Sequence, residues 1–393
     1  MGMQEAGNQT FKEAIRAYAH SIGIDKIGFT HAEPFLALEP KLRKQQALGH
    51  QSGFEHPVIE ERIYPELTLP KAQSFISIAL AYPSRPKQRV ETRKGEPRGS
   101  FARASWGIDY HHILREKLAL LVSYIEQSAE DYGIEAGQMV SMVDTGEFSD
   151  VSVAARAGLG FIGRNGLLIS REFGSYMYLG EILTSITFQP DPRVDYDCGD
   201  CDRCIRGCPT QALLGDGSMN AKRCLSYQTQ TKTLMPREFR KPMGRVIYGC
   251  DICQVICPYN RGIDVHHHPE MEPEGEVVFP ELKPILKMSN REFKAKFGHL
   301  AGSWRGKKPL QRNAIIALAN YQEMTAVPIL LELIEEDPRP EIRATAAWAL
   351  GEMPDLKGNQ EVIQLLKRTR EQESDSLIQA EYDDAIHQLE MHR

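Results

Sequence analysis

Eight cysteines are the residues of this sequence whose spacing most directly predicts chemistry. Three of them recur at intervals of three residues, a fourth follows after four and stands before a proline, and a shorter run downstream repeats the end of this pattern. In chain order they are Cys198, Cys201, Cys204, Cys208, Cys224, Cys250, Cys253 and Cys257. Thiolates at this spacing bind two [4Fe–4S] clusters, and the fourth cysteine of a run binds the other cluster. The sequence therefore predicts one-electron transfer.

This crossover rule assigns the cluster ligands and uses every cysteine. The expected sets are Cys198, Cys201, Cys204 and Cys257 for one cluster, and Cys208, Cys250, Cys253 and the remaining Cys224 for the other. A zinc ribbon would need paired C-x-x-C units, and disulfides would need an oxidising compartment. The first ten residues are polar and hold no apolar stretch typical of a secretion signal, so we expect reduced, metal-bound thiols in the cytoplasm.

Asp144 is the second candidate for chemistry. It ends a predicted strand, Met139 to Asp144, and precedes a Thr-Gly turn. Strand ends present catalytic groups in α/β sheets, which favours a proton donor, whereas an Asx-type turn would make the same carboxylate a cap for nearby amides. Both interpretations stay open on spacing alone. His111 and His112 fall on a predicted helix, where packing is the expected role.

Gly158 to Gly163 matches the dinucleotide-binding pattern G-x-G-x-x-G but in the wrong context. That motif needs a strand before it and a helix after it. Here a predicted helix, Asp150 to Ala157, comes first, and a predicted strand, Leu167 to Ser170, follows. We therefore expect a helix C-cap and a tight connection, with glycines that allow close backbone approach to something flat or large.

The elements that must position these residues begin with an α/β pattern. Helical spacing covers Phe11 to Ile22 and Asp109 to Tyr132, while Lys26 to Thr30 and Phe75 to Tyr82 have the length and composition of strands. Alternating helices and strands predict an α/β domain over residues 1–190. The segment Pro83 to Gly99, rich in Pro, Lys, Arg and Gly, is expected to be a solvated loop.

Two further regions follow. Residues 191–262 hold the cysteines and predict a bacterial ferredoxin-like domain with two clusters, inserted behind the sheet or following it. Residues 263–393 form the last region, and the histidine- and glutamate-rich segment Gly262 to Glu276 at its boundary is expected to be a solvated linker. Similar segments starting at Arg312 and Arg343 then predict HEAT-like helical repeats, with a terminal helix near Ala385 to Met391. Two units are short for a free solenoid, so they should pack on the preceding domain.

Charge limits the possible partners. The 393 residues carry a formal net charge of −6, so any nucleic-acid site must be a local patch, and no apolar run is long enough to span a membrane. One stretch contains seven cations and a single acid, Glu292. The cations are Arg291, Lys294, Lys296, Arg305, Lys307, Lys308 and Arg312. Phosphate attraction fits this stretch, although a solvated helix face would have a similar composition.

Several motifs together resemble the epoxyqueuosine reductase family. They are Val143 to Gly146, Ala157 to Asn165, Gly180 to Leu183, the two cysteine runs, Arg223 to Tyr227 and Ile247 to Gln254. The resemblance spans nearly the whole chain. It implies an α/β cobalamin-binding domain related to reductive dehalogenases, two [4Fe–4S] clusters, and reduction of epoxyqueuosine to queuosine at the wobble base of tRNA. Electrons would pass through both clusters to cobalamin, with Asp144 as the proton donor.

The resemblance also implies binding residues. Those matching cobalamin contacts are Arg62, Ala102, Asp144, Leu168, Leu179, Ser226, Cys250 and Asp251. Those matching tRNA contacts are Ser170, Thr233, Arg291, Lys307 and Lys308. The cobalamin should be base-off without a histidine ligand, because Asp264-x-His266 lacks the glycine of the histidine-on motif. The expected partners are tRNA with a GUN anticodon carrying epoxyqueuosine and a low-potential ferredoxin- or flavodoxin-like donor, and we expect a monomer.

Two other functions stay open from the sequence. The first is a ferredoxin-like electron carrier with the repeats as a docking surface, which would bind clusters but no corrin. The second is a cytoplasmic enzyme like the reductive dehalogenases, which would share the corrin core but has no need of a basic helical tail.

Overall fold

The computed structural model describes residues 2–391, with side chains from residue 7 onward. By packing, the chain forms two compact units. Unit 1 comprises the residues up to Arg85 together with Gly107–Cys224 and Asp251–Glu272, and unit 2 comprises Pro86–Trp106, Leu225–Cys250 and Pro273 onward. The three sequence regions expected above remain a prediction about domain boundaries.

A four-stranded sheet forms the centre of unit 1. Its strands, in spatial order, are β1 (Lys26–His31), β2 (Ser74–Ala81), β7 (Met177–Thr184) and β4 (Met139–Met142). Every neighbouring pair is antiparallel. Strands and helices alternate as predicted, but the sheet is antiparallel. The rule that catalytic groups lie at the carboxyl ends of strands applies to parallel sheets, so it does not explain the position of Asp144.

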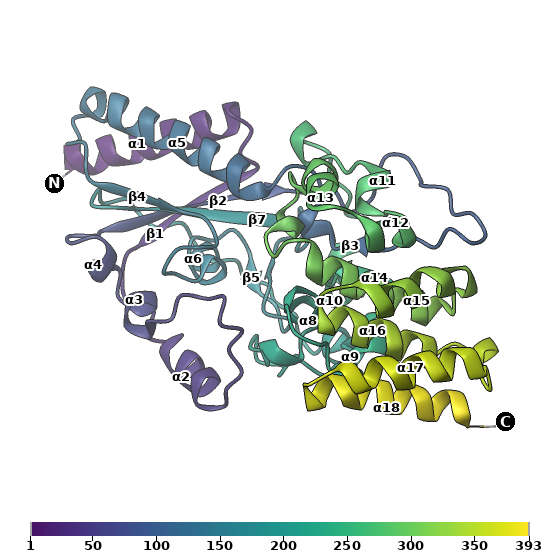
Figure 1. Ribbon diagram of the computed structural model, residues 1–393. Helices are drawn as coiled ribbons and strands as arrows, with labels where there is room; N and C mark the ends of the chain where they lie inside the picture. The colour runs from purple at the N-terminus through teal and green to yellow at the C-terminus, as the bar shows by residue number, and fades with distance from the viewer. Residues whose placement is uncertain (1, 392–393) are drawn as a thin grey trace. The chain divides into compact units, whose positions relative to one another are not determined.

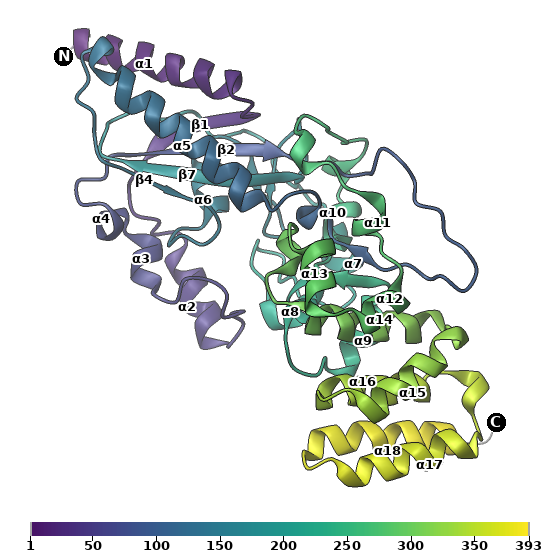
Figure 2. The ribbon, with the colours of Figure 1, turned by 45° about the horizontal axis from the view of Figure 1, so that its top comes forward.

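Helices cover both faces of this sheet. The long helices α1 (Gly2–Ser21) and α5 (Tyr110–Ser128) lie on one side, and α6 (Asp150–Arg156) lies on the other (Figures 1 and 2). Residues of β2 are buried along its whole length, because both faces are covered, and this explains its continuous apolar sequence. The predicted helix from Asp109 ends as an α-helix at Ser128, and a 3₁₀ turn, Ala129–Tyr132, continues it.

The remaining elements of unit 1 are short. They are α2 (Glu39–Ala47), α3 (Ile59–Ile63), α4 (Pro65–Thr68), β5 (Phe161–Ile162), β6 (Leu168–Ile169), α7 (Arg203–Gly207), α10 (Ile252–Val255) and the 3₁₀ turns Ala221–Arg223, Pro258–Asn260 and Pro269–Met271. An aromatic group of Phe35, Phe75 and Phe148 lies in the core beneath α3. Short elements joined by loops are what a cluster-binding region requires, since metal ligation replaces much of a hydrophobic core.

The glycine-rich segment after α6 forms the predicted C-cap. Gly158 has φ +77°, and the Leu159 N–H donates to the Ala154 carbonyl at 3.0 Å, as in a helix C-terminal motif. A Cβ on Gly160 would approach the Ile169 carbonyl oxygen to 2.4 Å. The close approach that this glycine allows is therefore to the antiparallel β5–β6 pair of the same chain, which explains the motif without a dinucleotide.

Unit 2 contains the helical repeats. Its parallel pair β3 (Ser100–Phe101) and β8 (Val246–Tyr248) is accompanied by α8 (Leu225–Gln230), α9 (Arg237–Met243), α11 (Gly275–Val278), α12 (Leu282–Lys287), α13 (Asn290–Phe297) and the 3₁₀ turns Arg103–Ser105 and Ala301–Ser303. The repeat helices are α14 (Lys307–Tyr321), α15 (Val327–Glu336), α16 (Pro340–Gly351), α17 (Gln360–Gln372) and α18 (Ser376–Glu390), with the 3₁₀ turns Met324–Ala326 and Pro354–Leu356 (Figure 1). The last helix thus begins nine residues before the predicted start at Ala385.

Buried polar contacts join the repeats to the 225–250 segment of unit 2. Arg240 of α9 and Glu381 of α18 form a bidentate pair with N···O distances of 2.7 and 2.8 Å. Asn313 of α14 donates from its amide to the carbonyls of Thr229 and Ile247, each at 2.8 Å. The repeats therefore lean on neighbouring structure, as their small number predicts.

The histidine-rich segment is not the solvated linker that we expected. His267 and His268 contact the two carboxylate oxygens of Asp25, at 2.6 and 2.7 Å, and His268 is buried. The Ala81 N–H also donates to Asp25 at 2.7 Å. A carboxylate far away in the sequence orders this segment, which composition alone could not reveal. Among residues 2–391, no helix is both long and apolar enough to cross a lipid bilayer.

Candidate functional site

Asp144 occupies the loop between β4 and α6, near the N-terminal end of α5. Its φ of +55° places it in the left-handed region, which few residues other than glycine adopt, and Asp and Asn are among the exceptions. The Asp144 N–H donates to the carboxylate of Asp150, the first residue of α6, at 2.9 Å. The side chain is 61% exposed. The loop therefore holds the backbone of Asp144 while its carboxylate stays open to a substrate.

His111 connects this loop to α5. Its Nδ1 lies 2.7 Å from Oδ1 of Asp109 and its Nε2 lies 3.3 Å from Oδ2 of Asp144. Asp109 also caps α5 by accepting from the His111 N–H at 3.1 Å. Burial alone would lower the pKa of His111, but these two carboxylates outweigh it and raise that pKa to about 9. The contact with His111 in turn lowers the pKa of Asp144.

A second carboxyl pair lies behind the Asp144 loop. Glu181 of β7 is fully buried, and neither of its carboxylate oxygens has a hydrogen-bond donor within the described part of the chain. Burial, followed by the negative charge of Asp150, raises the pKa of Glu181 well above its usual range. Burial, followed by Asp144, raises the pKa of Asp150 to about 6. Neighbouring carboxyl groups disfavour each other's ionisation where no counter-charge is present, and this favours the protonated form of Glu181.

Aromatic rings fix the other side of His111. The ring of Tyr110 stacks on His111 with a centroid distance of 4.1 Å and on Tyr178 of β7 at 4.3 Å, with 4° between the last two planes. Burial and the nearby Asp144 carboxylate raise the pKa of Tyr110, which keeps its hydroxyl neutral. His111 thus has a defined orientation set by α5 and the sheet.

The eight cysteines are all partly buried, neither fully enclosed nor fully exposed. Burial raises the pKa of Cys204, and its next causes include the neighbouring Cys198 and Cys257. Burial likewise raises the pKa of Cys257, with contributions from Cys198 and Cys201. Cys198 thus acts electrostatically on both Cys204 and Cys257, and Cys201 acts on Cys257. These four cysteines are the set expected for one cluster.

Cys208 has a different environment from this first group. The Ala212 N–H donates to its sulfur at 3.3 Å, and backbone and Thr210 hydrogen bonds outweigh burial to lower the pKa of the thiol. Backbone donors stabilise a thiolate and are a means by which proteins tune iron–sulfur clusters. The donor set therefore fits iron–sulfur ligation.

The resemblance matches eight residues to cobalamin contacts. Besides Asp144, four of them belong to unit 1. Leu168 is buried among Ala79, Ala154 and Met177, and Leu179 packs against the same cluster. The half-buried guanidinium of Arg62 makes no ion pair with any described residue, and burial lowers its pKa. Asp251 is half-buried at the start of α10. An apolar wall and an available cation fit a corrin that carries amides and a phosphate.

The other three predicted cobalamin residues belong to unit 2. Ala102 is buried, and it follows β3 and packs against Gly249, where an added Cβ would approach the Ala102 Cβ to 2.4 Å. Ser226 lies in α8, where its carbonyl accepts from the Gln230 amide at 2.9 Å. Cys250 lies two residues after the end of β8, with Gly249 between them. The small size of Ala102 and Gly249 thus permits close backbone packing beside Cys250.

The predicted tRNA contacts differ in accessibility. Arg291 and Thr233 are exposed, whereas Lys307 donates to the Met288 carbonyl at 2.9 Å and Lys308 pairs with Glu341 at 2.8 Å. Ser170 is fully buried, so its side chain has no surface for tRNA in this conformation.

Arg312 does not belong to the basic surface that its sequence position suggested. It is buried, and it donates to the carbonyls of Gln228, Thr231 and Thr233 at 2.5 to 2.9 Å. A guanidinium supplies five donors, and here they satisfy backbone carbonyls. Arg312 is therefore a structural residue.

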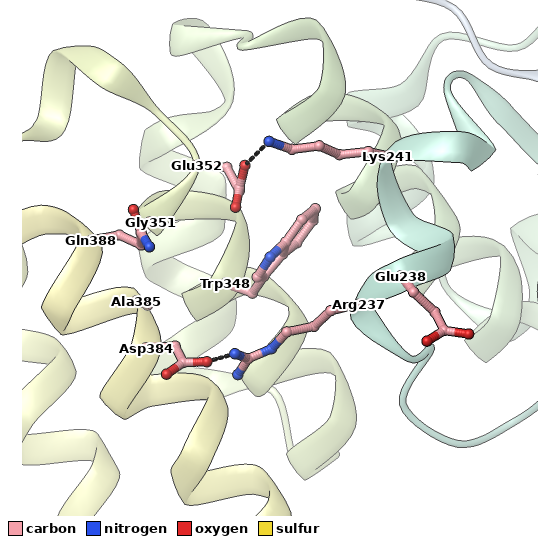
Figure 3. A pocket seen from close by; sticks show the side chains of 9 residues that line it. All are labelled: Arg237, Glu238, Lys241, Trp348, Gly351, Glu352, Asp384, Ala385 and Gln388. Atoms are coloured by element: carbon pink, nitrogen blue, oxygen red, sulfur yellow. Dashed lines mark ion pairs between the residues drawn. The ribbon is translucent and has the colours of Figure 1, made fainter.

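A hollow of unit 2 also contains cations, between α9 and the ends of α16 and α18. Arg237 faces Asp384, and Lys241 faces Glu352 at 3.2 Å, on either side of Trp348 (Figure 3). Because an acid of the repeats neutralises each cation, this hollow has little attraction for an anion.

Sequence reasoning missed two members of the site. His111 was assigned to packing, since a helical pattern does not show which loop its N-terminus will meet. Glu181 lies within an apolar stretch that forms a strand. A glutamate in such a stretch is expected to be buried, and a buried carboxylate is a candidate functional group, so the sequence could have indicated it.

Comparison with protein-family models gave three matches along the chain. Residues 62–145 match "Epoxyqueuosine reductase QueG, DUF1730", residues 197–260 match "4Fe-4S double cluster binding domain", and residues 305–385 match "HEAT repeats". The cysteine region is thus a double-cluster domain for two [4Fe–4S] clusters, and the C-terminal helices are HEAT repeats, as the sequence predicted.

Relatives match over nearly the whole chain. The epoxyqueuosine reductase of Listeria monocytogenes is 54% identical over 95% of this chain and 96% of its own length, and that of Bacillus subtilis is 52% identical over 92% and 93%. A crystal structure of epoxyqueuosine reductase with an epoxyqueuosine-modified tRNA-Tyr stem loop matches with TM-score 0.92 and 50% identity, covering 98% of this chain and all of that one. A Bacillus subtilis structure whose catalytic aspartate loop is swung out of the active site matches equally well, over 97% and 100%.

Proposed function

Because the chain belongs to the epoxyqueuosine reductase family, we propose that it is an oxidoreductase that reduces epoxyqueuosine to queuosine at the wobble position of tRNA. The observation that carries this proposal is the full-length similarity to a relative whose structure holds an epoxyqueuosine-modified stem loop. The open carboxylate of Asp144, held by its loop and by His111, is the group best placed to act as proton donor.

The overall reaction requires two electrons and two protons. The epoxide loses its oxygen as water, and a carbon–carbon double bond forms. The proposed electron source is a low-potential one-electron donor of the ferredoxin or flavodoxin class, acting through two [4Fe–4S] clusters. One cluster would use Cys198, Cys201, Cys204 and Cys257, and the other would use Cys208, Cys224, Cys250 and Cys253. These sets follow from the crossover rule, and the electrostatic effects of Cys198 on Cys204 and Cys257 support the first set.

We further propose a base-off cobalamin without a histidine ligand, which when bound would supply a redox-active cobalt to the epoxide carbon. The residues proposed to hold it are Arg62, Ala102, Asp144, Leu168, Leu179, Ser226, Cys250 and Asp251. The apolar surroundings of Leu168 and the available guanidinium of Arg62 support this set. This chain would contribute the apolar wall, the anion contact and the protonic group.

The proposed tRNA is one with a GUN anticodon, bound at Thr233, Arg291, Lys307 and Lys308, with Ser170 least supported because it is buried. Residues 1–190 would form the cobalamin-binding domain, residues 191–262 the cluster domain, and residues 263–393 the connecting segment and repeats. We propose a cytoplasmic monomer.

The deciding experiment combines spectroscopy with a product assay. The protein is purified anaerobically and reconstituted with iron, sulfide and cobalamin, and tRNA carrying epoxyqueuosine is then incubated with it and a low-potential reductant. Digestion and mass spectrometry should show queuosine replacing epoxyqueuosine, and electron paramagnetic resonance should show a base-off cobalt signal. Clusters without bound corrin and without product would instead favour the electron carrier.

A further inference from the structure

We infer that His111 supplies Asp144 with the proton that the epoxide oxygen takes up, and that Asp109 positions His111 for this role. This inference rests on the proposed function, because it names the source of a proton in that reaction. It extends the site from one aspartate to the relay Asp109–His111–Asp144, which is defined by these three residues.

The first support is the placement of the imidazole between two carboxylates. Nδ1 lies 2.7 Å from Asp109 and Nε2 lies 3.3 Å from Asp144. A neutral imidazole has one N–H, so it can donate to only one of these oxygens. Imidazolium has two and can donate to both. The geometry therefore favours a ring that carries the extra proton.

The second support is that the proton donor, His111, is held in place whereas the proton acceptor, Asp144, is open to solvent. Asp109 accepts from both the backbone and the ring of His111, and the ring stacks on Tyr110, which stacks on Tyr178 of the sheet. The side chain of His111 is 19% exposed, whereas that of Asp144 is 61% exposed. His111 is thus fixed behind Asp144, and Asp144 faces outward.

The acidic groups around the ring also favour its protonated form. Asp109 of the α5 cap, Asp144 of the loop and Asp150 of α6 are acidic, Tyr110 is neutral, and His112 is a basic group on the same helix. Arg115 reaches the loop through Thr145 at 3.5 Å. The pKa of His111 is raised to about 9 and that of Asp144 is lowered, so at neutral pH the proton resides on His111. An isolated carboxylate with a low pKa would have no proton to give.

Protons and electrons balance in the proposed step. When the first epoxide C–O bond breaks, its electron pair stays on oxygen, which becomes a much stronger base than a carboxylate, and the first electron from the reductant goes to the carbon. The Nε2 proton of His111 moves to the ionised Asp144, which passes a proton on to this oxygen, and Asp109 stays ionised beside the imidazole. Solvent then returns a proton to His111. A second proton and the second electron accompany cleavage of the other C–O bond, and the oxygen leaves as water.

The first test measures the proton on His111 without any turnover. The cluster-loaded protein is labelled with ¹⁵N-histidine, the His111 resonances are identified by their loss in His111→Gln, and their pH titration is followed. We expect a midpoint of about 9, above the ordinary value of about 6.5, and a lower midpoint in both Asp144→Asn and Asp109→Asn. A midpoint at or below the ordinary value would overturn the inference.

The second test uses single turnovers of pre-reduced, cobalamin-loaded enzyme with epoxyqueuosine tRNA. His111→Gln should slow reduction by about 10²-fold or more without changing tRNA affinity. The wild-type rate should fall as pH rises through about 9, and Asp109→Asn should move this fall to lower pH. A purely structural role of Asp109 would change the rate without moving the profile. His112→Gln, an exposed neighbour, is the matched control.

The outcomes separate the two claims. A wild-type protein that forms no queuosine at any pH would refute the proposed function. An active wild type with an equally fast, folded His111→Gln variant would refute the relay alone. If His111→Gln fails to fold, as judged by circular dichroism and cluster absorption, Asp109→Asn and its pH profile decide the question.

Discussion

At residue 144 the backbone and the side chain impose separate requirements. The left-handed φ of +55° is accessible to Asp and Asn but costly for β-branched residues, and the carboxylate must remain open beside His111. Asparagine satisfies the first requirement and fails the second. Replacing Asp144 by asparagine therefore separates proton transfer from loop conformation.

We predict that Asp144→Asn lowers the single-turnover rate of epoxyqueuosine reduction by about 10²- to 10⁴-fold, the usual contribution of a general acid. The thermal midpoint and the cluster absorption should stay unchanged, because Asn keeps the backbone conformation. Reduction at the wild-type rate would remove Asp144 from the reaction.

Glu181 allows a prediction about stability. Because burial raises the folded-state pKa of Glu181 above its unfolded value, the folded state holds this proton more tightly, and stability falls as pH rises through the folded pKa. Asp150, with a pKa of about 6, acts in the same direction. Glu181→Gln replaces the carboxyl group by a neutral amide of the same shape. It should therefore remove the part of this pH-dependent loss of stability that Glu181 causes.

Thermal unfolding of the cluster-loaded protein between pH 5 and pH 8 tests this expectation. The midpoint of the wild type should decrease more across this range than that of Glu181→Gln. Glu335→Gln changes an exposed glutamate of α15 and should behave as the wild type. Parallel curves for all three proteins would mean that Glu181 does not titrate on unfolding.

At the scale of elements, the buried Arg240–Glu381 ion pair is one of the contacts that join α9 to α18. Arg240 lies over Trp348 with 4.8 Å from its guanidinium carbon to the ring, and it pairs with Glu381 through two hydrogen bonds. Removing one partner leaves a buried charge, so Glu381→Gln should cost about 3–5 kcal/mol in the free energy of unfolding. The double variant Arg240→Met with Glu381→Leu should recover much of this loss. Urea unfolding monitored by circular dichroism measures both.

The basic segment before and within α14 allows a prediction about RNA. Removing one cation that neutralises an RNA phosphate should reduce the slope of log affinity against log salt by about 0.7 to 0.9. Replacing Lys307 and Lys308 by alanine should therefore weaken binding of an anticodon stem loop and reduce this slope by roughly one to two. Lys367→Ala is a matched control, since it removes another lysine paired with a glutamate, Glu390. An unchanged slope would place the tRNA elsewhere.

At the scale of the whole molecule, the cysteine assignment predicts an iron content. Two [4Fe–4S] clusters require about eight irons per chain. If Cys198, Cys201, Cys204 and Cys257 hold one cluster, Cys201→Ala should lower the anaerobically reconstituted content to about four irons, and Cys253→Ala should remove the other four. Iron and acid-labile sulfide analysis measures this. Loss of all iron in either variant would contradict two independently assembled clusters.

The sequence by itself determined what depends on local spacing. The cysteine runs indicated two clusters, and the paired segments at Arg312 and Arg343 indicated repeats. The helical and strand patterns indicated β1, β2, α5 and α6 to within a few residues, whereas α1 begins at Gly2, nine residues before the predicted Phe11. Ligand spacing and hydrophobic periodicity are properties of short sequence windows, so they can be recognised in the sequence without the structure.

Only the tertiary structure decided which distant groups meet. His111 contacts Asp144 across 33 positions, His268 contacts Asp25 across 243, and Arg312 turns inward to backbone carbonyls 79 to 84 positions away. The antiparallel sheet brings Glu181 behind the Asp144 loop. A residue's protonation and accessibility depend on the neighbours that packing supplies, and packing is set by the whole chain rather than by any one segment of it.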